Sequence, residues 1–261
     1  MTYSNIAVQI TDSISEITLN CPEKRNPLSS STIAELTAAL EEIAESDTLS
    51  VILGAQGMVF STGHDINEML GRELAGMRAL MHACTRLMQL IHNIPQLVVA
   101  KVQGPAIGAG CQLALSCDMV VMSEKAFFRT AGGSGGWFCF TPMVAVARAV
   151  GRKRALEMLM VGDPISAELA SEWGMINRVV PAEKLDVETR DLATRATRGS
   201  PLMMGLGKQV FYHQIDLDEA QAYAYATELM ASTGTMEHPQ ERMRAFVEKR
   251  SPVFNDKRGV Q

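Results

Sequence analysis

The sequence predicts an α/β fold built on a largely parallel sheet. Apolar, β-branched runs at 51–53 and 97–102 predict buried strands. Between the two runs, apolar residues recur at the spacing of a helix. Such alternation is typical of parallel strands joined by helices. A Gly-rich turn follows each run, at 61–65 and at 104–112. From Arg148 onward the chain is mostly helical, so a helical region is expected to follow the sheet.

The remaining elements follow from the spacing of apolar residues. Residues 6–19 alternate in places, which predicts a hairpin turning near 11–13. The segments expected to be helical are 29–46, 66–93 with breaks near Gly71 and Gly76, 109–117, 144–160, 166–173, 183–198, 201–212, 217–233 and 238–250. Two further strands are expected at 118–122 and 176–180. A boundary near 195–200 divides a core at 1–197 from a C-terminal helical region at 198–261.

Composition limits the kinds of partner. Hydrophobic residues make up 47% of the chain and charged residues 20%, as in folded soluble proteins. The net charge of −5 argues against nucleic acid, because phosphate binding requires a basic face. No apolar run reaches the roughly 18 residues that span a membrane, so no membrane partner is expected. The 17 methionines fit either core packing or a lipid-shaped pocket.

Cysteine and histidine usage bears on compartment and metal binding. The five cysteines are an odd number without pairing spacings, which predicts reduced thiols and a cytoplasmic protein. The amino terminus lacks a basic region followed by an apolar stretch, so no secretory signal is expected. The five histidines form no H-E-x-x-H or C-x-x-C grouping, so no metal is expected. There is no P-loop, and Leu113 replaces the third glycine of a dinucleotide fingerprint.

The two Gly-rich turns indicate a chemistry. Each precedes a helical segment, and such turns present unpaired backbone N–H groups where negative charge is favoured. Two of them in one domain can aim two donors at a single carbonyl oxygen and stabilise an oxyanion. This arrangement favours stabilisation of a thioester enolate.

Seven segments taken together resemble the crotonase (enoyl-CoA hydratase/isomerase) superfamily over nearly the whole chain. They are, in order, 25–28, 60–66, 102–111, 117–118, 162–167, 174–180 and 245–254. Segments 111–113 and 137–142 are similar to the subgroup called enoyl-CoA hydratase domain-containing protein 3. The resemblance implies a crotonase/ClpP-like fold of repeated ββα units with a C-terminal helical region that builds a homotrimer, often paired into a hexamer. It also implies an acyl-CoA ligand, with coenzyme A as part of the substrate and no separate cofactor.

The resemblance also implies site residues. The backbone N–H groups of His64 and Ala109 would form the oxyanion hole. Trp137 and Phe140 would line an acyl pocket. The residues that would contact coenzyme A are Lys24, Arg25, His64, Asp65, Ile66, Asn67 and Lys208. Each of the cations fits a solvated surface charge equally well, and the His64 ring fits packing, a pantetheine contact or proton transfer.

Hydratases of this family use two glutamates, and this chain lacks both. Gln112 and Gly132 occupy the corresponding positions. No Asp or Glu occurs between Glu124 and Glu157. A glutamine amide does not exchange a proton at neutral pH, so ordinary hydration is not expected.

Three hypotheses stay open at this point. The first is an acyl-CoA enzyme with a different reaction, in which water, the substrate or one of His64, Cys139 and Arg129 moves the proton. The second is a non-catalytic protein that binds acyl-CoA or a partner. The third is a hydratase that recruits another acid, for example Glu68.

Overall fold

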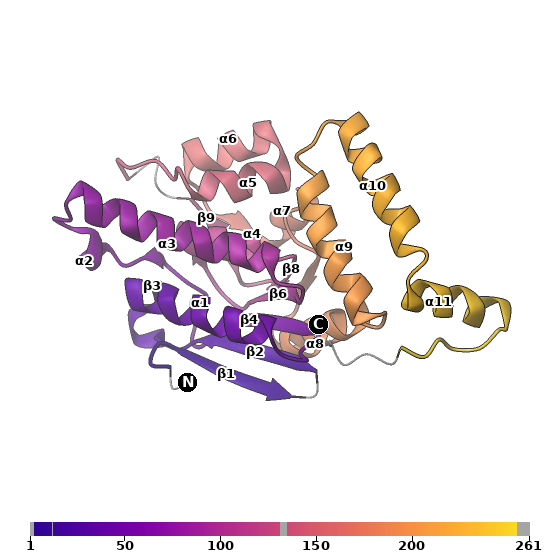
Figure 1. Cartoon of the computed structure of the whole chain (residues 1–261). Coiled ribbons are helices and arrows are strands. Elements are labelled where there is room, and N and C mark those ends of the chain that lie inside the picture. The colour runs from indigo at the N-terminus through magenta and orange to yellow at the C-terminus, as the bar shows by residue number, and fades with distance from the viewer. Residues whose placement is uncertain (1–2, 12, 131–134, 255–261) are drawn as a thin grey trace.

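The computed structural model describes residues 3–11, 13–130 and 135–254, and its centre is a six-stranded sheet (Figure 1). Its strands run in the order β1-β2-β4-β6-β8-β11, with β1 and β2 antiparallel and each later neighbour parallel. The bounds are β1 Ile6–Thr11, β2 Ile14–Leu19, β4 Ser50–Ala55, β6 Leu97–Val102, β8 Met119–Ser123 and β11 Arg178–Val180. The predicted α/β fold is therefore confirmed, as is the N-terminal hairpin.

Two small sheets lie beside the central one. They were not expected as sheets, because strands of two or three residues are too short to show alternation. The three-stranded sheet contains β7 Ala106–Ile107, β9 Phe127–Arg129 and β10 Ile165–Ser166; the two-stranded sheet contains β3 Pro27–Leu28 and β5 Gly63–His64. Both small sheets hold strands from the Gly-rich turns, so they fix where those turns sit.

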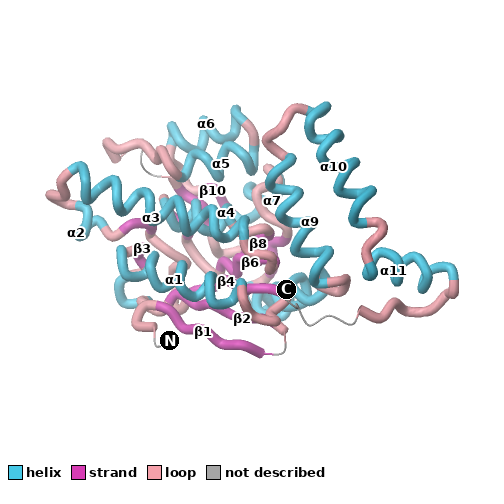
Figure 2. Tube along the Cα trace, viewed as in Figure 1, coloured by secondary structure: helices cyan, strands magenta, loops and turns pink. Residues whose placement is uncertain are grey.

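Helices cover the central sheet on both faces (Figure 2). Helices α1, α3 and α4 share one large apolar core with the sheet, whereas α8 packs on the opposite face against Ile52, Val99 and Val121. The bounds are α1 Ser30–Ala44, α2 Ile66–Met69, α3 Leu74–Asn93, α4 Ala109–Ser116, α5 Pro142–Val150, α6 Arg152–Val161, α7 Ala167–Glu172, α8 Leu185–Ala196, α9 Pro201–Gln214, α10 Glu219–Thr233 and α11 Glu237–Val247, with short 3₁₀ turns η1 Pro22–Lys24 and η2 Ala182–Lys184.

Glycine explains where two helix predictions were right and where they were wrong. The break near Gly71 is confirmed, since that residue has φ +74 between α2 and α3. No break occurs at Gly76, because α3 runs through it at the modest cost of one helical glycine. The single helix expected at 144–160 is instead two helices, because Gly151 has φ +73, which ends α5 before α6 begins.

The C-terminal helices extend to one side of the sheet (Figure 1). Helix α9 packs against α3, while α10 contains no buried residue among those described. The predicted division at 197/198 stays a prediction.

Candidate oxyanion site

The two Gly-rich turns lie against each other. Ser61 bridges to Ala106, and the Ile107 N–H donates to the Ser61 carbonyl at 2.9 Å. A Cβ added to Gly63 would lie 2.8 Å from the Ile107 oxygen and 2.9 Å from the Ala109 nitrogen. The backbone beside His64 therefore reaches the first residue of α4.

Two glycines set the direction of the peptide groups at this contact. Gly63 has φ +85, and Gly108 has φ +55 with ψ −119; both conformations favour glycine. Gly108 is the N-cap of α4 and makes no side-chain cap. Because the first N–H groups of a helix have no partner within it, the Ala109 N–H at this terminus is suited to receive an anion.

Asn26 braces the site through buried hydrogen bonds, a role that its sequence context does not predict. Its side chain is buried, donates to the Gln56 and Val59 carbonyls at 2.8 Å each, and accepts from the Cys21 N–H at 2.9 Å. Its own carbonyl accepts from the Ser61 hydroxyl at 2.7 Å. The acceptors Gln56 and Val59 are 30 and 33 residues away along the chain, so no local pattern predicts this brace.

The His64 imidazole is half-buried beside β3. Burial lowers the pKa of His64 below its ordinary value of 6.5, and the Leu28 backbone and the Glu68 carboxylate oppose this shift only in part. Neither ring nitrogen makes a hydrogen bond of standard geometry with a described residue. The neutral ring is therefore favoured at neutral pH.

Gln112, at one of the two glutamate positions, is only 5% exposed. Its amide oxygen is fully buried and accepts no hydrogen bond from any described residue. Gly132, at the other position, lies outside the described residues.

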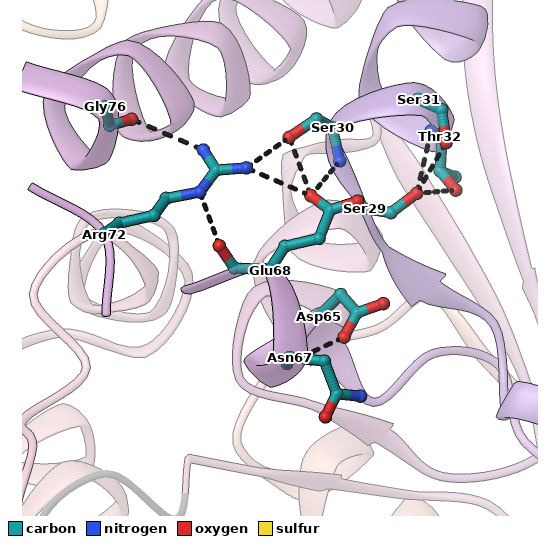
Figure 3. Close-up of polar contacts among 9 residues, drawn as sticks. All are labelled: Ser29, Ser30, Ser31, Thr32, Asp65, Asn67, Glu68, Arg72 and Gly76. Atoms are coloured by element: carbon teal, nitrogen blue, oxygen red, sulfur yellow. Dashed lines mark hydrogen bonds and ion pairs between the residues drawn. The ribbon is translucent and has the colours of Figure 1, made fainter. Parts of the chain in front are cut away.

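Glu68 is held at the start of α1 (Figure 3). Its carboxylate accepts from the backbone N–H of Ser30 at 2.8 Å and from the Ser30 hydroxyl at 2.7 Å. The Arg72 guanidinium contacts the same carboxylate at 3.4 Å and also donates to the Glu68 carbonyl. A carboxylate is stabilised at a helix N-terminus, so this network clamps α1 to α2 and argues against Glu68 as the missing acid.

The residues predicted for the nucleotide end of coenzyme A flank the Gly63 turn. Asp65 caps α2 through a bond from the Asn67 N–H at 2.9 Å (Figure 3), and Ile66 is 67% exposed. The Lys24 and Arg25 side chains are exposed. The Arg25 carbonyl accepts from the Thr62 N–H at 3.2 Å, which ties this segment to the same turn.

Lys208 lies in a buried polar cluster, not at the Gly-rich turns. Its ammonium pairs with Asp118 at 2.7 Å and donates to the Ile91 and Gln96 carbonyls at 2.6 and 2.7 Å. Both partners of the ion pair are less than 9% exposed. Burial lowers the pKa of Lys208 although Asp118 opposes the shift. All three ammonium hydrogens are used within the chain, so this geometry argues against the predicted phosphate contact.

The remaining predicted side chains lie on or near the 135–141 segment. Trp137 and Phe140 are 53% and 59% exposed, so these two rings do not enclose an acyl pocket within this chain alone. Cys139 packs partly against the core. The Arg129 side chain donates to the Gly162 carbonyl at 2.8 Å, which engages one of the guanidinium hydrogens.

Within 3–11, 13–130 and 135–254, no three His, Cys, Asp or Glu side chains gather as metal ligands would. Over those same ranges, every helix is too short or too polar to cross a membrane.

Comparisons with known proteins agree with the fold. A family profile described as Enoyl-CoA hydratase/isomerase matches residues 9–257, and the chain belongs to this family, the crotonase superfamily. A protein of Rattus norvegicus named Enoyl-CoA hydratase domain-containing protein 3, mitochondrial, is 42% identical over 94% of this chain and 82% of the relative. A putative enoyl-CoA hydratase of Thermus thermophilus is 34% identical over 92% of this chain and 97% of its own.

Solved structures give the same result. An enoyl-CoA hydratase of Mycobacterium smegmatis superposes with a TM-score of 0.94 at 36% identity, covering 97% of this chain and all of the other. The human enoyl Coenzyme A hydratase domain-containing protein 3 gives 0.92 at 39% identity, covering 96% and 100%. The predicted resemblance, including the subgroup, is confirmed. The name of the rat relative assigns that protein to mitochondria, and the cytoplasmic location expected for this chain stays a prediction.

Proposed function

We propose that this protein binds acyl-CoA and stabilises the thioester enolate between the backbone N–H groups of His64 and Ala109. The observation that carries the proposal is the contact between the two Gly-rich turns, where a Cβ added to Gly63 would lie 2.9 Å from the Ala109 nitrogen. Two fixed backbone donors aimed at one oxygen stabilise charge as it develops there and need no side chain. Asn26 and Ser61 hold the donors in place through their buried hydrogen bonds.

The proposed reaction is not glutamate-driven hydration. Gln112 exchanges no proton, and Glu68 is held at the N-terminus of α1. A positioned acid or base typically contributes about 10²–10⁴-fold to a rate, so hydration of enoyl-CoA is expected to be very slow. Water or the substrate is then the source of any proton, and the neutral His64 ring is suited to accept a proton.

Replacing Ala109 by proline tests the oxyanion assignment. Proline is tolerated at the first position of a helix and removes one N–H donor. We expect Ala109→Pro to weaken binding of trans-2-enoyl-CoA and to abolish the long-wavelength shift of its conjugated thioester absorbance, because that shift requires a polarised carbonyl. Ala109→Gly keeps the N–H and is the matched control. If the proline variant shows the same shift as the control, Ala109 does not form the oxyanion hole.

A second candidate is acyl-CoA binding without chemistry, and the amide at position 112 favours it. The enoyl-CoA absorbance separates the two candidates. A shift on binding followed by slow loss of absorbance supports an enzyme, and a shift that persists supports a binding protein. Fast loss of absorbance would contradict the argument from the missing glutamates.

We also propose a homotrimer or a dimer of trimers built by the C-terminal helices. Large apolar side chains stay exposed there, and α10 buries none of its residues; the exposed set on α9, α10 and α11 includes Phe211, Tyr223, Met230, Met243 and Phe246. Exposed apolar patches of this kind are typical of protein interfaces. Sedimentation equilibrium is expected to give three or six times the monomer mass of 28.4 kDa. A monomer at micromolar concentration would exclude the assembly.

A further inference from the structure

Strand β1 is an open edge of the central sheet. It is the first strand in the sheet order, and among the described residues only β2 pairs with it. Figure 1 shows it at the lower border of the molecule, with no described helix or strand beyond it. Residues 7–11 are exposed, including the apolar side chains of Val8 at 36% and Ile10 at 61%. An edge strand presents a row of N–H and C=O groups that have no partner within the sheet.

The hydrogen bonds to β2 define which residues of β1 point outward. The Asn20 N–H donates to the Asn5 carbonyl at 2.8 Å, so this carbonyl faces β2. In an antiparallel pair, successive residues direct their backbone groups alternately toward the partner strand and away from it. With the observed register, the odd-numbered residues of β1 therefore bond to β2. The outward N–H and C=O groups, to which no described residue bonds, belong to Ile6, Val8 and Ile10.

β1 has none of the features that usually keep an edge strand from pairing. Proline, charged side chains and bulges block such edges in many proteins. The strand has the sequence Ile-Ala-Val-Gln-Ile-Thr, without a proline or a charge, and its pairing with β2 is continuous over all six positions. Ile6 is buried in the core, whereas Val8 and Ile10 continue the same face and stay exposed. This edge is therefore a template for one more strand.

We propose that β1 pairs with β1 of a second copy of this chain, antiparallel and about a twofold axis that passes between the two Val8 residues. In this register Val8 faces Val8 and Ile6 faces Ile10, so every outward N–H and C=O group of both strands is paired. Moving the axis to Ala7 or to Gln9 leaves one outward residue of each β1 without a partner in the other. The pairing joins two six-stranded sheets into one continuous sheet.

The side chains favour a second copy as the partner. Facing β-branched residues stabilise an antiparallel pair, and like charges directly opposite each other destabilise it. Val8 against Val8 and Ile6 against Ile10 are all β-branched, and on the other face Ala7 meets Gln9, so no charges oppose each other. A twofold contact uses the same surface on both copies and closes after two, so it does not extend into a fibre.

This contact is separate from acyl-CoA binding and from the contacts of the C-terminal helices. In Figure 1, β1 and α10 lie on different sides of the molecule. A trimer built by the helices keeps one free β1 edge on each copy, and pairing of these edges joins two trimers. The inference therefore does not rest on the proposed enolate chemistry, and a failure of acyl-CoA binding leaves it standing.

Val8→Pro tests the pairing in the full-length chain. Proline removes the outward N–H of residue 8 and leaves the hydrogen bonds to β2 in place, and edge strands tolerate proline where the N–H faces solvent. Val8→Thr keeps the N–H and the β-branched shape and is the matched control. By sedimentation velocity at micromolar concentration, we expect an even number of copies for the wild type and for Val8→Thr. We expect half that number for Val8→Pro.

Two results would overturn the pairing of β1. One is an odd number of copies in the wild type, and the other is a folded Val8→Pro assembly as large as that of the wild type. If circular dichroism shows that Val8→Pro is unfolded, Val8→Lys takes its place, because two lysines opposed at the axis repel each other while every backbone group is kept. Val8→Lys is also expected to halve the assembly, and an unchanged mass for this variant would overturn the pairing equally.

Discussion

Gly110→Ala is expected to lower the free energy of unfolding by about 2–4 kcal/mol, a cost typical of forced overpacking. A Cβ at this position would lie 2.5 Å from the Ser61 carbonyl oxygen and 2.7 Å from the Ser61 Cβ. Ser61 cannot move away freely, since its carbonyl accepts from Ile107 and its hydroxyl donates to Asn26. The substitution would therefore push the two Gly-rich turns apart and weaken acyl-CoA binding as well.

Gly207→Ala is the matched control for this experiment. Gly207 lies inside α9, and an added Cβ would meet nothing within 4 Å. Alanine is the better helix former, so this variant should be unchanged or more stable by up to about 1 kcal/mol. Urea denaturation, monitored by circular dichroism, measures the free energy of unfolding of both variants. Equal stabilities for the two variants would mean that the turns do not pack as closely as described.

Lys208→Met is expected to lower the free energy of unfolding by about 3–5 kcal/mol, because it leaves the buried Asp118 carboxylate without its counter-ion. The Val98 N–H at 2.6 Å and the Tyr212 hydroxyl at 2.8 Å still bond that carboxylate but carry no compensating charge. The carbonyls of Ile91 and Gln96 also lose their donor. Because these partners lie on α3 and directly before β6 and β8, the C-terminal helix α9 should loosen from the sheet first. Hydrogen exchange of α9 and urea denaturation measure the two effects.

Two control variants test whether the effect of Lys208→Met comes from the burial of its ion pair. Combining Lys208→Met with Asp118→Asn should recover part of the loss, since the uncompensated charge is gone. The exposed pair Arg148–Asp216 spans 3.6 Å with both side chains at least 60% exposed. Arg148→Met should therefore change stability by less than about 1 kcal/mol. A cost for Lys208→Met as small as this would contradict the described burial of the pair.

The elements of the core could be predicted because their physics is local. Alternation at 6–19 gives the hairpin, and apolar spacing at 29–46 gives α1, whose N-cap Ser29 accepts from the Thr32 N–H at 3.1 Å. Glycine with positive φ ends helices, but nothing local distinguishes Gly151, which does so, from Gly76, which does not. The strands of the two small sheets are too short to carry a period, and each pairs with a segment distant in the sequence.

Roles that depend on distant partners could not be predicted. Glu68 has the chemistry of an acid in the sequence, yet Ser30, 38 residues earlier, holds its carboxylate. Asn26 carries no signal of its own, although it connects the segments before and after it through four hydrogen bonds. In each case the partner is set by packing, which a local pattern does not encode.

The sequence by itself determined the alternation of strands and helices, the two Gly-rich turns and the absence of glutamate at position 112. These follow from side-chain size, backbone freedom and proton chemistry, all of which belong to single residues or short spacings. Only the tertiary structure decided which polar groups are satisfied. It uses every donor of Lys208 inside the chain and leaves the buried Gln112 amide oxygen unpaired. Hydrogen bonds and desolvation depend on which distant segments pack together, and a single residue or a short spacing does not encode that packing.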